Sequence, residues 1–302
     1  DAVIAGSDEI WKIDKKKPHV SFPSFYWLRG DIGARKIAFA ASANKTQIHE
    51  LTDSERIWVS EALNDYELIG VRDNLTRDFV MSVGIEDPAK VQKVPDPTFM
   101  LDLPPCDMRE ILVGNGADPG RPMAAILLTD NRINRHVCDF FRRNGIQTVS
   151  LLNSDDSADV NLVGKLDPLQ WGCIFKYFSF CVTGRFHGAI FSLKNRVPFI
   201  AIDDVFDYGP YESKVLSLLR DIDPCLERYY IDGFMPGLDL EHALQKLFPA
   251  SRAYMSEQLL REGENRMKRH CLDFLAKIEH VMESDESTVR AGTVRRSVEQ
   301  SG

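Results

Sequence analysis

Short apolar runs alternate with amphipathic stretches along most of the chain. The apolar runs are bounded by glycine or by polar turns and have the length of buried strands. We predict strands at residues 1–6, 36–41, 68–71, 123–128, 146–151, 177–182 and 197–202. The intervening stretches predict helices at residues 52–65, 73–82, 131–144, 168–176 and 211–220 and from His187 onward. Strands that alternate with helices in this way are typical of an α/β fold with parallel sheets.

The length and the distribution of turn residues indicate two domains. A chain of 302 residues is long enough for two. Four prolines and three glycines lie between residues 103 and 122, which is the composition of a linker. The chain opens directly with a strand, so we expect the first domain to be truncated at its N-terminus. We predict an N-terminal domain at 1–105, a C-terminal domain at 106–250, a helical segment at 251–283 and a disordered polar tail at 284–302.

Composition and charge exclude several classes of protein. The chain is 44% hydrophobic and 27% charged, which is ordinary for a globular protein. Its net charge of −8 argues against a nucleic-acid partner, because binding to a phosphate backbone needs a basic face. None of the apolar runs approaches the roughly 18 to 20 residues that a membrane span needs. The six cysteines form no CxxC pair and have no metal-ligand spacing, so we expect reduced thiols in a cytoplasmic protein and no metal site.

The most informative chemistry lies at residues 182–190, where a predicted strand passes into a predicted helix. Ligands of open α/β sheets bind at the carboxyl ends of strands, close to helix N-termini that attract anions. Arg185 offers a planar fork for a phosphate or carboxylate, and His187 can move a proton near neutral pH. Gly184 and Gly188 flank this pair. The pattern alone leaves a purely structural role for His187 equally open.

The first predicted strand ends in a second group of polar residues. Gly6 permits close approach of a backbone, Ser7 and Asp8 can bond hydroxyl groups, and Trp11 can stack on a sugar ring. The alternative interpretation is a helix N-cap followed by a tryptophan of the core.

Three further candidates lie at later strand ends. Ser42 belongs to a run of small residues that makes room for a ligand or for a packed helix. Asp96 precedes a proline and is either part of a structural bend or a carboxylate aimed into a cleft. Lys214 follows the turn Gly209-Pro210 and starts a helix, where a cation is unfavourable unless an anion shares the site. A solvated lysine is its alternative interpretation.

Taken together, these motifs resemble the polysaccharide pyruvyl transferase family. The matching segments are residues 5–11, 38–42, 71–73, 94–97, 184–188 and 197–200, and their order and spacing match over roughly residues 1–220. The resemblance implies two Rossmann-like domains facing a cleft, as in GT-B glycosyltransferases. The sequence departs from the family at 42–44, where Ser-Ala-Asn replaces serine-aromatic-glycine, and the glycine-rich turn expected before Asp1 is absent.

The resemblance also implies transfer of a pyruvyl group from phosphoenolpyruvate to two hydroxyls of a sugar, with formation of a cyclic ketal and release of phosphate. Phosphoenolpyruvate is then a co-substrate, and no cofactor is needed. The sugar acceptor belongs to a polysaccharide or to a lipid-linked precursor, which implies at most peripheral contact with a membrane. The oligomeric state is not predicted.

Roles are carried over residue by residue. Arg185 and His187 match the donor-site arginine and histidine of the family, and Lys214 matches its donor-site lysine more loosely. We expect His187 to be the acid and Asp8 to take a hydroxyl proton. Gly184 and Gly188 complete the donor site. The acceptor-binding residues expected are Gly6, Ser7, Trp11, Ser42 and Asp96.

Two other functions compete with this one. A nucleotide-sugar glycosyltransferase of the same architecture would use Arg185 and Lys214 to hold a diphosphate. A non-catalytic glycan-binding relative would keep the fold without the activity.

Overall fold

The computed structural model describes residues 1–13, 22–30, 32–44, 46–154, 156–204 and 213–299, with side chains up to residue 283. These residues belong to two compact units. The first comprises Asp1–Pro97 together with Lys268–Gly302, and the second comprises Thr98–Met267. The division therefore falls between Pro97 and Thr98, whereas the sequence predicts it near residue 105.

The first unit is built on a parallel sheet in the order β1-β2-β3-β4. Its strands are β1 (Ala2–Asp8), β2 (Arg35–Ala41), β3 (Tyr66–Val71) and β4 (Val91–Lys93). At Gly6, with φ +152°, β1 runs so close to β2 that a Cβ would overlap the carbonyl oxygen of Phe39. The glycine is therefore required by strand pairing.

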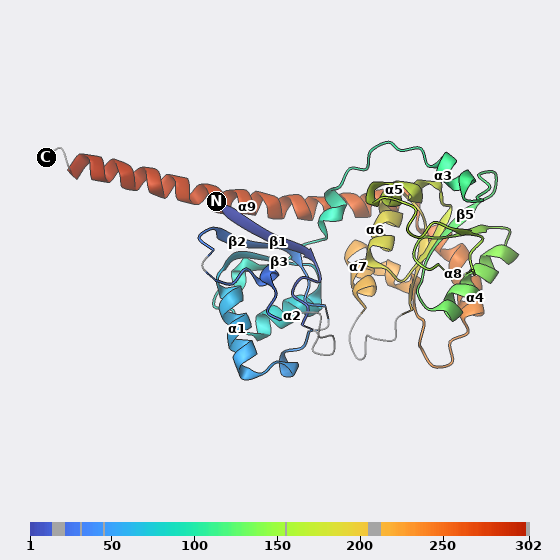
Figure 1. Ribbon diagram of the computed structural model, residues 1–302, viewed down its shortest axis with the longest axis horizontal. Helices are drawn as coiled ribbons and strands as arrows, with labels where there is room; N and C mark the ends of the chain where they lie inside the picture. The colour runs from blue at the N-terminus through green and yellow to red at the C-terminus, as the bar shows by residue number, and fades with distance from the viewer. Residues whose placement is uncertain (14–21, 31, 45, 155, 205–212, 300–302) are drawn as a thin grey trace. The chain divides into compact units, whose positions relative to one another are not determined.

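Two helices cover one face of this sheet, and both begin at capping side chains. Thr52 and Glu55 form a capping box at the start of α1 (Asp53–Asn64). Asp73 caps α2 (Asn74–Ser82) by accepting a hydrogen bond from the Thr76 amide. The other face is covered by the later part of α9 (Glu257–Glu299), which belongs to this unit from Lys268 onward (Figure 1). There the Phe274 ring packs edge-on against the Phe39 ring of β2, with ring centroids 5.4 Å apart. The sheet is thus enclosed between helices.

The second unit contains a parallel sheet in the order β10-β9-β8-β5-β6-β7. Its strands are β5 (Met123–Leu127), β6 (Gln147–Ser150), β7 (Val160–Asn161), β8 (Phe180–Thr183), β9 (Phe199–Asp203) and β10 (Tyr230–Asp232). The chain builds outward from β5 in one direction and then from β8 in the other. The boundary between β5 and β8 is therefore a topological switch point, where ligands of such sheets bind.

Helices lie on both faces of this second sheet. Right-handed crossovers that run in opposite directions place their helices on opposite faces. Accordingly, α4 (Asn131–Arg143) packs with α8 (Leu240–Tyr254), and α6 (Phe186–Lys194) packs with α7 (Lys214–Ile222) (Figure 1). Two short helices, α3 (Arg109–Gly114) and α5 (Pro168–Cys173), complete the unit.

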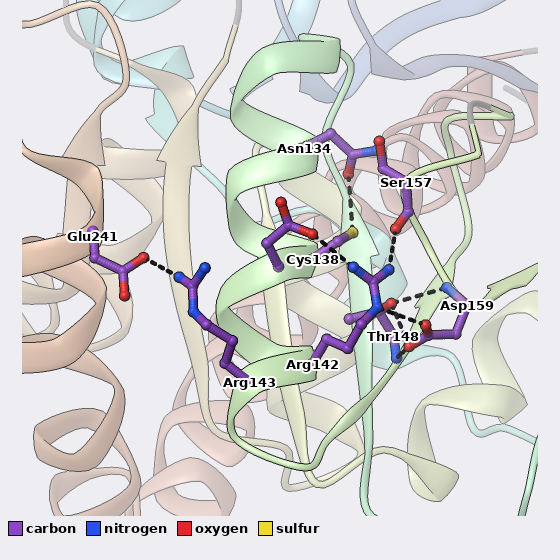
Figure 2. A network of polar contacts seen from close by, with 9 residues as sticks. Asn134, Cys138, Arg142, Arg143, Thr148, Ser157, Asp159 and Glu241 are labelled. Carbon is purple, nitrogen blue, oxygen red and sulfur yellow. Dashed lines mark hydrogen bonds and ion pairs between the residues drawn. The ribbon is translucent and has the colours of Figure 1, made fainter.

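Hydrogen bonds and ion pairs connect α4 to α8 and to the segment that precedes β7 (Figure 2). Arg142 bonds Asp159 at 3.0 Å and Asp139 at 2.6 Å, and Asp159 in turn accepts hydrogen bonds from the amide and hydroxyl of Thr148. Arg143 forms an ion pair with Glu241 of α8. These contacts hold α4 against β6 and α8, so the helix has a fixed position beside the switch point.

The C-terminal part of the chain differs most from the expectation. One helix was predicted from residue 251, but α8 ends at Tyr254 and α9 begins at Glu257, with the hydroxyl of Ser256 accepting a hydrogen bond from the Leu259 amide. The tail predicted as disordered continues this helix to Glu299. Within the part of the chain that the structure describes, no helix, α9 included, has the length and apolarity needed to cross a membrane.

Candidate active site

Polar side chains gather in the second unit where β5, β8 and β9 end. Thr129 follows β5, Arg185 follows β8 and Asp204 follows β9. Because the three strands are parallel neighbours, their carboxyl ends meet at one edge of the sheet. The cluster therefore occupies the switch point.

Arg185 is held by hydrogen bonds at its backbone and at its guanidinium. It is the N-cap of α6, and its amide donates to the hydroxyl of Thr183 at 2.9 Å. Its guanidinium Nη2 donates to the hydroxyl of Thr129 at 2.8 Å. The Nε is buried and has no hydrogen-bond partner among the described residues. A fixed guanidinium beside the positive end of a helix is suited to an anion.

The two glycines of the segment are required by close packing. A Cβ on Gly184 would overlap Oδ1 of Asp204 and lie 2.7 Å from the carbonyl oxygen of Ile202. A Cβ on Gly188 would overlap the hydroxyl of Thr183. Both glycines thus let the strand ends and α6 approach each other around Arg185, which is a structural role within the site.

His187 and Lys214 lie at the N-terminal ends of two different helices. His187 is the second residue of α6, is half-buried and meets the Phe186 ring edge-on with centroids 5.7 Å apart. Lys214 is the first residue of α7, half-buried, and Ser213 caps that helix. The turn Gly209-Pro210 that precedes it lies outside the described residues. Lys214 was predicted to share an anion with Arg185, and this stays a prediction.

Two neighbouring carboxylates at the end of β9 are buried, and one of them contacts the cluster. Asp204 accepts hydrogen bonds on Oδ2 from the hydroxyl of Thr129 at 2.9 Å and from the amides of Thr129 and Asp130. Its neighbour Asp203 accepts a hydrogen bond from the hydroxyl of Tyr230 at 2.7 Å. Burial raises the pKa of the Asp203 carboxyl, and the nearby charge of Asp204 adds to the rise.

The first unit has its own arginine at the carboxyl edge of its sheet. Arg72 follows β3 and forms an ion pair with Asp96 at 3.0 Å and a longer one with Asp8 at 3.4 Å. The side chains of Arg72 and Asp96 are 2% and 1% exposed, whereas that of Asp8 is 72% exposed. Asp96 is therefore a buried partner of Arg72, and Asp8 is the carboxylate of this group that faces solvent.

The remaining acceptor-site predictions have different outcomes. Trp11 is completely buried and stacks on Trp27 with ring centroids 5.5 Å apart, so the prediction that it stacks on a sugar is wrong and the core interpretation holds. Ser42 is buried and donates its hydroxyl to Asp73 at 2.7 Å, which ties it to the start of α2. Ser7 lies in β1 next to Asp8 and is half-buried.

A separate pocket of about 720 Å³ opens in the second unit between α4 and the segment that joins β10 to α8. Arg132 and His136 contribute its polar lining from α4, and Phe234 and Met235 contribute apolar lining. It contains none of the predicted site residues. The strand-edge cluster has the convergent hydrogen bonds and the buried charges that this pocket lacks, so we place the candidate site at the strand edge.

Comparison with known proteins identifies the family. A family model described as polysaccharide pyruvyl transferase matches residues 1–204, more than half of the 302 residues. The chain belongs to this family. The matched region includes Asp8, Arg72 and Asp96 of the first unit and Arg185, His187 and Asp204 of the second. No curated protein matches the chain.

Solved structures agree on the fold of this pyruvyl transferase family member. The chain resembles a putative UDP-N-acetylglucosamine 2-epimerase from Listeria monocytogenes (TM-score 0.54, 8% identity, 83% of this chain and 69% of that one). It also resembles a sucrose-phosphate synthase from Thermosynechococcus elongatus (TM-score 0.52, 13% identity, 86% of this chain and 71% of that one). A third match is a UDP-forming trehalose-phosphate synthase from Burkholderia xenovorans (TM-score 0.52, 11% identity, 82% of this chain and 69% of that one). At such low identity they show the fold alone, and the predicted GT-B-like α/β class is confirmed.

Three residues of the two clusters were not predicted from the sequence. Arg72 belongs to a matching motif, but the sequence assigns it no role, and it predicts neither Thr129 nor Asp204 as a site residue. Each of them follows a parallel strand within two residues. That shared position was the available signal, because the residues that follow neighbouring parallel strands meet at one edge of the sheet.

Proposed function

We propose that this protein transfers a pyruvyl group from phosphoenolpyruvate to two hydroxyls of a sugar, forming a cyclic ketal and releasing phosphate. The observation that carries the proposal is Arg185, fixed by Thr129 at the switch point, with His187 in the first turn of the same helix. Membership of the pyruvyl transferase family supports the reaction class.

The donor is an anion with a phosphate and a carboxylate, and the second unit offers matching charges. Arg185 supplies two-pronged hydrogen bonding, and the positive end of α6 adds to the attraction. Lys214 at the start of α7 is the proposed second cation. Gly184 and Gly188 allow β8, the end of β9 and α6 to pack closely around Arg185, and in this way they are proposed to shape the donor site.

His187 is the proposed acid. It protonates the methylene carbon of the donor, which leaves an oxocarbenium-like centre that the first sugar hydroxyl attacks. Loss of phosphate then creates the centre that the second hydroxyl attacks. Two hydroxyl protons are released in total. One replaces the proton that His187 gave to carbon, and the other leaves with hydrogen phosphate.

Asp8 is the proposed base on the acceptor side. Its carboxylate is largely exposed and forms an ion pair with Arg72 at 3.4 Å. Ser7 and Gly6 stand beside it in β1 and are proposed to contact the sugar. The acceptor is proposed to be part of a polysaccharide or of a lipid-linked precursor. The six cysteines are reduced in the structure, which fits a cytoplasmic location, where thiols stay reduced.

The direct test is release of inorganic phosphate from phosphoenolpyruvate in the presence of a panel of sugars. We expect His187→Ala to lower kcat by about 100-fold to 10,000-fold, the range typical of a lost general acid, with little change in KM for the donor. Arg185→Ala should instead raise that KM. His136→Ala is the matched control, because His136 is an exposed histidine of α4 outside the cluster.

The outcomes separate the proposal from its competitors. Full turnover of His187→Ala would remove the acid role. Release of a nucleotide from a sugar donor, without phosphate release from phosphoenolpyruvate, would identify a glycosyltransferase. Thermal stabilisation by a glycan but not by phosphoenolpyruvate would identify a binding protein.

A further inference from the structure

A continuous hydrogen-bonded chain leads from the guanidinium of Arg185 to a buried carboxylate. Nη2 of Arg185 donates to the hydroxyl of Thr129 at 2.8 Å, and the same hydroxyl donates its own proton to Oδ2 of Asp204 at 2.9 Å. The three residues follow three neighbouring strands, β5, β8 and β9. The chain therefore crosses the switch point of the sheet.

The geometry fixes the direction of each hydrogen bond. An arginine can only donate and a carboxylate can only accept, so the hydroxyl between them must accept from Arg185 and donate to Asp204. Asp204 also accepts hydrogen bonds from the amides of Thr129 and Asp130. These amides hold the backbone of the loop independently of the hydroxyl. The hydroxyl itself thus has one remaining task, which is to orient the guanidinium.

The surroundings make this orientation matter. Asp204 is 4% exposed, and its other oxygen, Oδ1, has no hydrogen-bond partner among the described residues. The Nε of Arg185 is likewise buried and has no hydrogen-bond partner among the described residues. At the buried Asp204 end of the chain, a charge-assisted hydrogen bond is stronger than it is in water. At the other end Thr129 is exposed and Arg185 is half-buried, so the oriented guanidinium stays accessible to an anion.

We propose that Thr129 and Asp204 are positioning residues for Arg185, which they hold ready for the anionic group of the donor. This inference rests on the proposed function for the identity of the anion, phosphoenolpyruvate. Neither residue touches the donor in this proposal. Thr129 acts through Arg185, and Asp204 acts through Thr129.

Two measurements on the full chain test the proposal. The first is modification of Arg185 by phenylglyoxal, quantified by mass spectrometry without any donor. Thr129→Val, which keeps the side-chain shape and the backbone hydrogen bonds, should raise the rate at Arg185 by about threefold or more. Thr129→Ser, which restores the hydroxyl, should return the rate to that of the unchanged protein.

The second measurement is the dissociation constant for phosphoenolpyruvate by calorimetry. We expect Thr129→Val to weaken binding by about 10-fold, the effect of one charge-assisted hydrogen bond, and Thr129→Ser to restore it. In an Arg185→Ala background, Thr129→Val should have no further effect, because the two residues act as one unit. A general structural defect would instead weaken binding in both backgrounds.

The outcomes are distinct. Unchanged modification of Arg185 in Thr129→Val overturns the inference, whatever the donor is. Faster modification with unchanged donor binding overturns it as well, because the positioning would then serve nothing. A third outcome is faster modification in Thr129→Val when the protein without substitutions does not bind phosphoenolpyruvate. That outcome supports the positioning role and rejects the proposed function.

Discussion

Burial decides how much each carboxylate contributes to holding Arg72. Asp96 and Asp8 contact the same guanidinium, but Asp96 is buried and Asp8 is largely exposed. Removing one member of a buried pair leaves an uncompensated charge, whereas an exposed pair contributes little. We predict that Asp96→Ala destabilises the first unit by about 3–5 kcal/mol, and that Asp8→Ala costs about 1 kcal/mol or less.

Tryptophan fluorescence during urea unfolding measures this difference. Trp11, Trp27 and Trp58 lie in the first unit and Trp171 lies in the second, so a Trp171→Phe background reports the first unit alone. Equal losses for the two variants would contradict the prediction and would mean that Arg72 is held by Asp8 as firmly as by Asp96.

At this scale the sequence predicted that several polar and aromatic residues follow strands, but it did not predict which way their side chains point. Trp11 and Asp96 both follow strands and both turn inward. The direction depends on the backbone after each strand, as at Asp8, where φ is +73°. Positive φ at an aspartate is uncommon and leaves little trace in the pattern of residue types. Arg72, Thr129 and Asp204 were missed for the related reason that their partners come from other strands.

Among the elements, those with a strong period or a clear cap were predicted well. The predicted helix at 52–65 corresponds to α1, which begins after the capping side chain of Thr52. The break between α8 and α9 was not predicted. It depends on Met255, which leaves helical geometry at ψ +65°, and on the hydroxyl of Ser256, which caps the next helix. Apolar spacing continues through the break, so periodicity alone joins the two helices.

The junction of β8 and α6 supplies the prediction at this scale. Gly184→Ala would place a methyl group against Asp204 and Ile202, both of β9 or its end. We expect the second unit to lose about 1–3 kcal/mol through overpacking, and donor binding to weaken because Arg185 moves with its neighbour. Gly114→Ala is the control, since nothing lies within 4 Å of a Cβ there and the residue is helical.

Thermal unfolding and calorimetric titration check this pair of variants. Gly114→Ala should be neutral or slightly stabilising, by up to about 1 kcal/mol, because alanine favours a helix more than glycine does. If Gly184→Ala matched the control in both measurements, the close packing of β8 against Asp204 would have no energetic consequence.

At the scale of the whole molecule, α9 contributes residues to both units. Before Met267 it packs on the second unit, where a Cβ on Gly263 would lie only 2.9 Å from the Ile222 side chain and Glu264 pairs with Lys194 at 3.0 Å. From Lys268 it covers the first sheet through Phe274. The sequence predicts two α/β domains and a C-terminal helix, but not this sharing, because helical periodicity does not reveal which sheet an apolar face will meet.

Because α9 belongs to both units, we predict that substitutions before and after Met267 destabilise different units. Phe274→Ala should destabilise the first unit by about 3–5 kcal/mol and Leu260→Ala the second by about 2–5 kcal/mol, since both side chains are buried. Leu272→Ala, at a 49% exposed position between them, should have little effect. Native-state hydrogen exchange resolves the units, with β2 and β3 reporting the first and β8 and β9 the second. If Phe274→Ala accelerated exchange equally in both sets of strands, α9 would couple the two units into one cooperative body, and the division at Met267 would describe their packing without describing their stability.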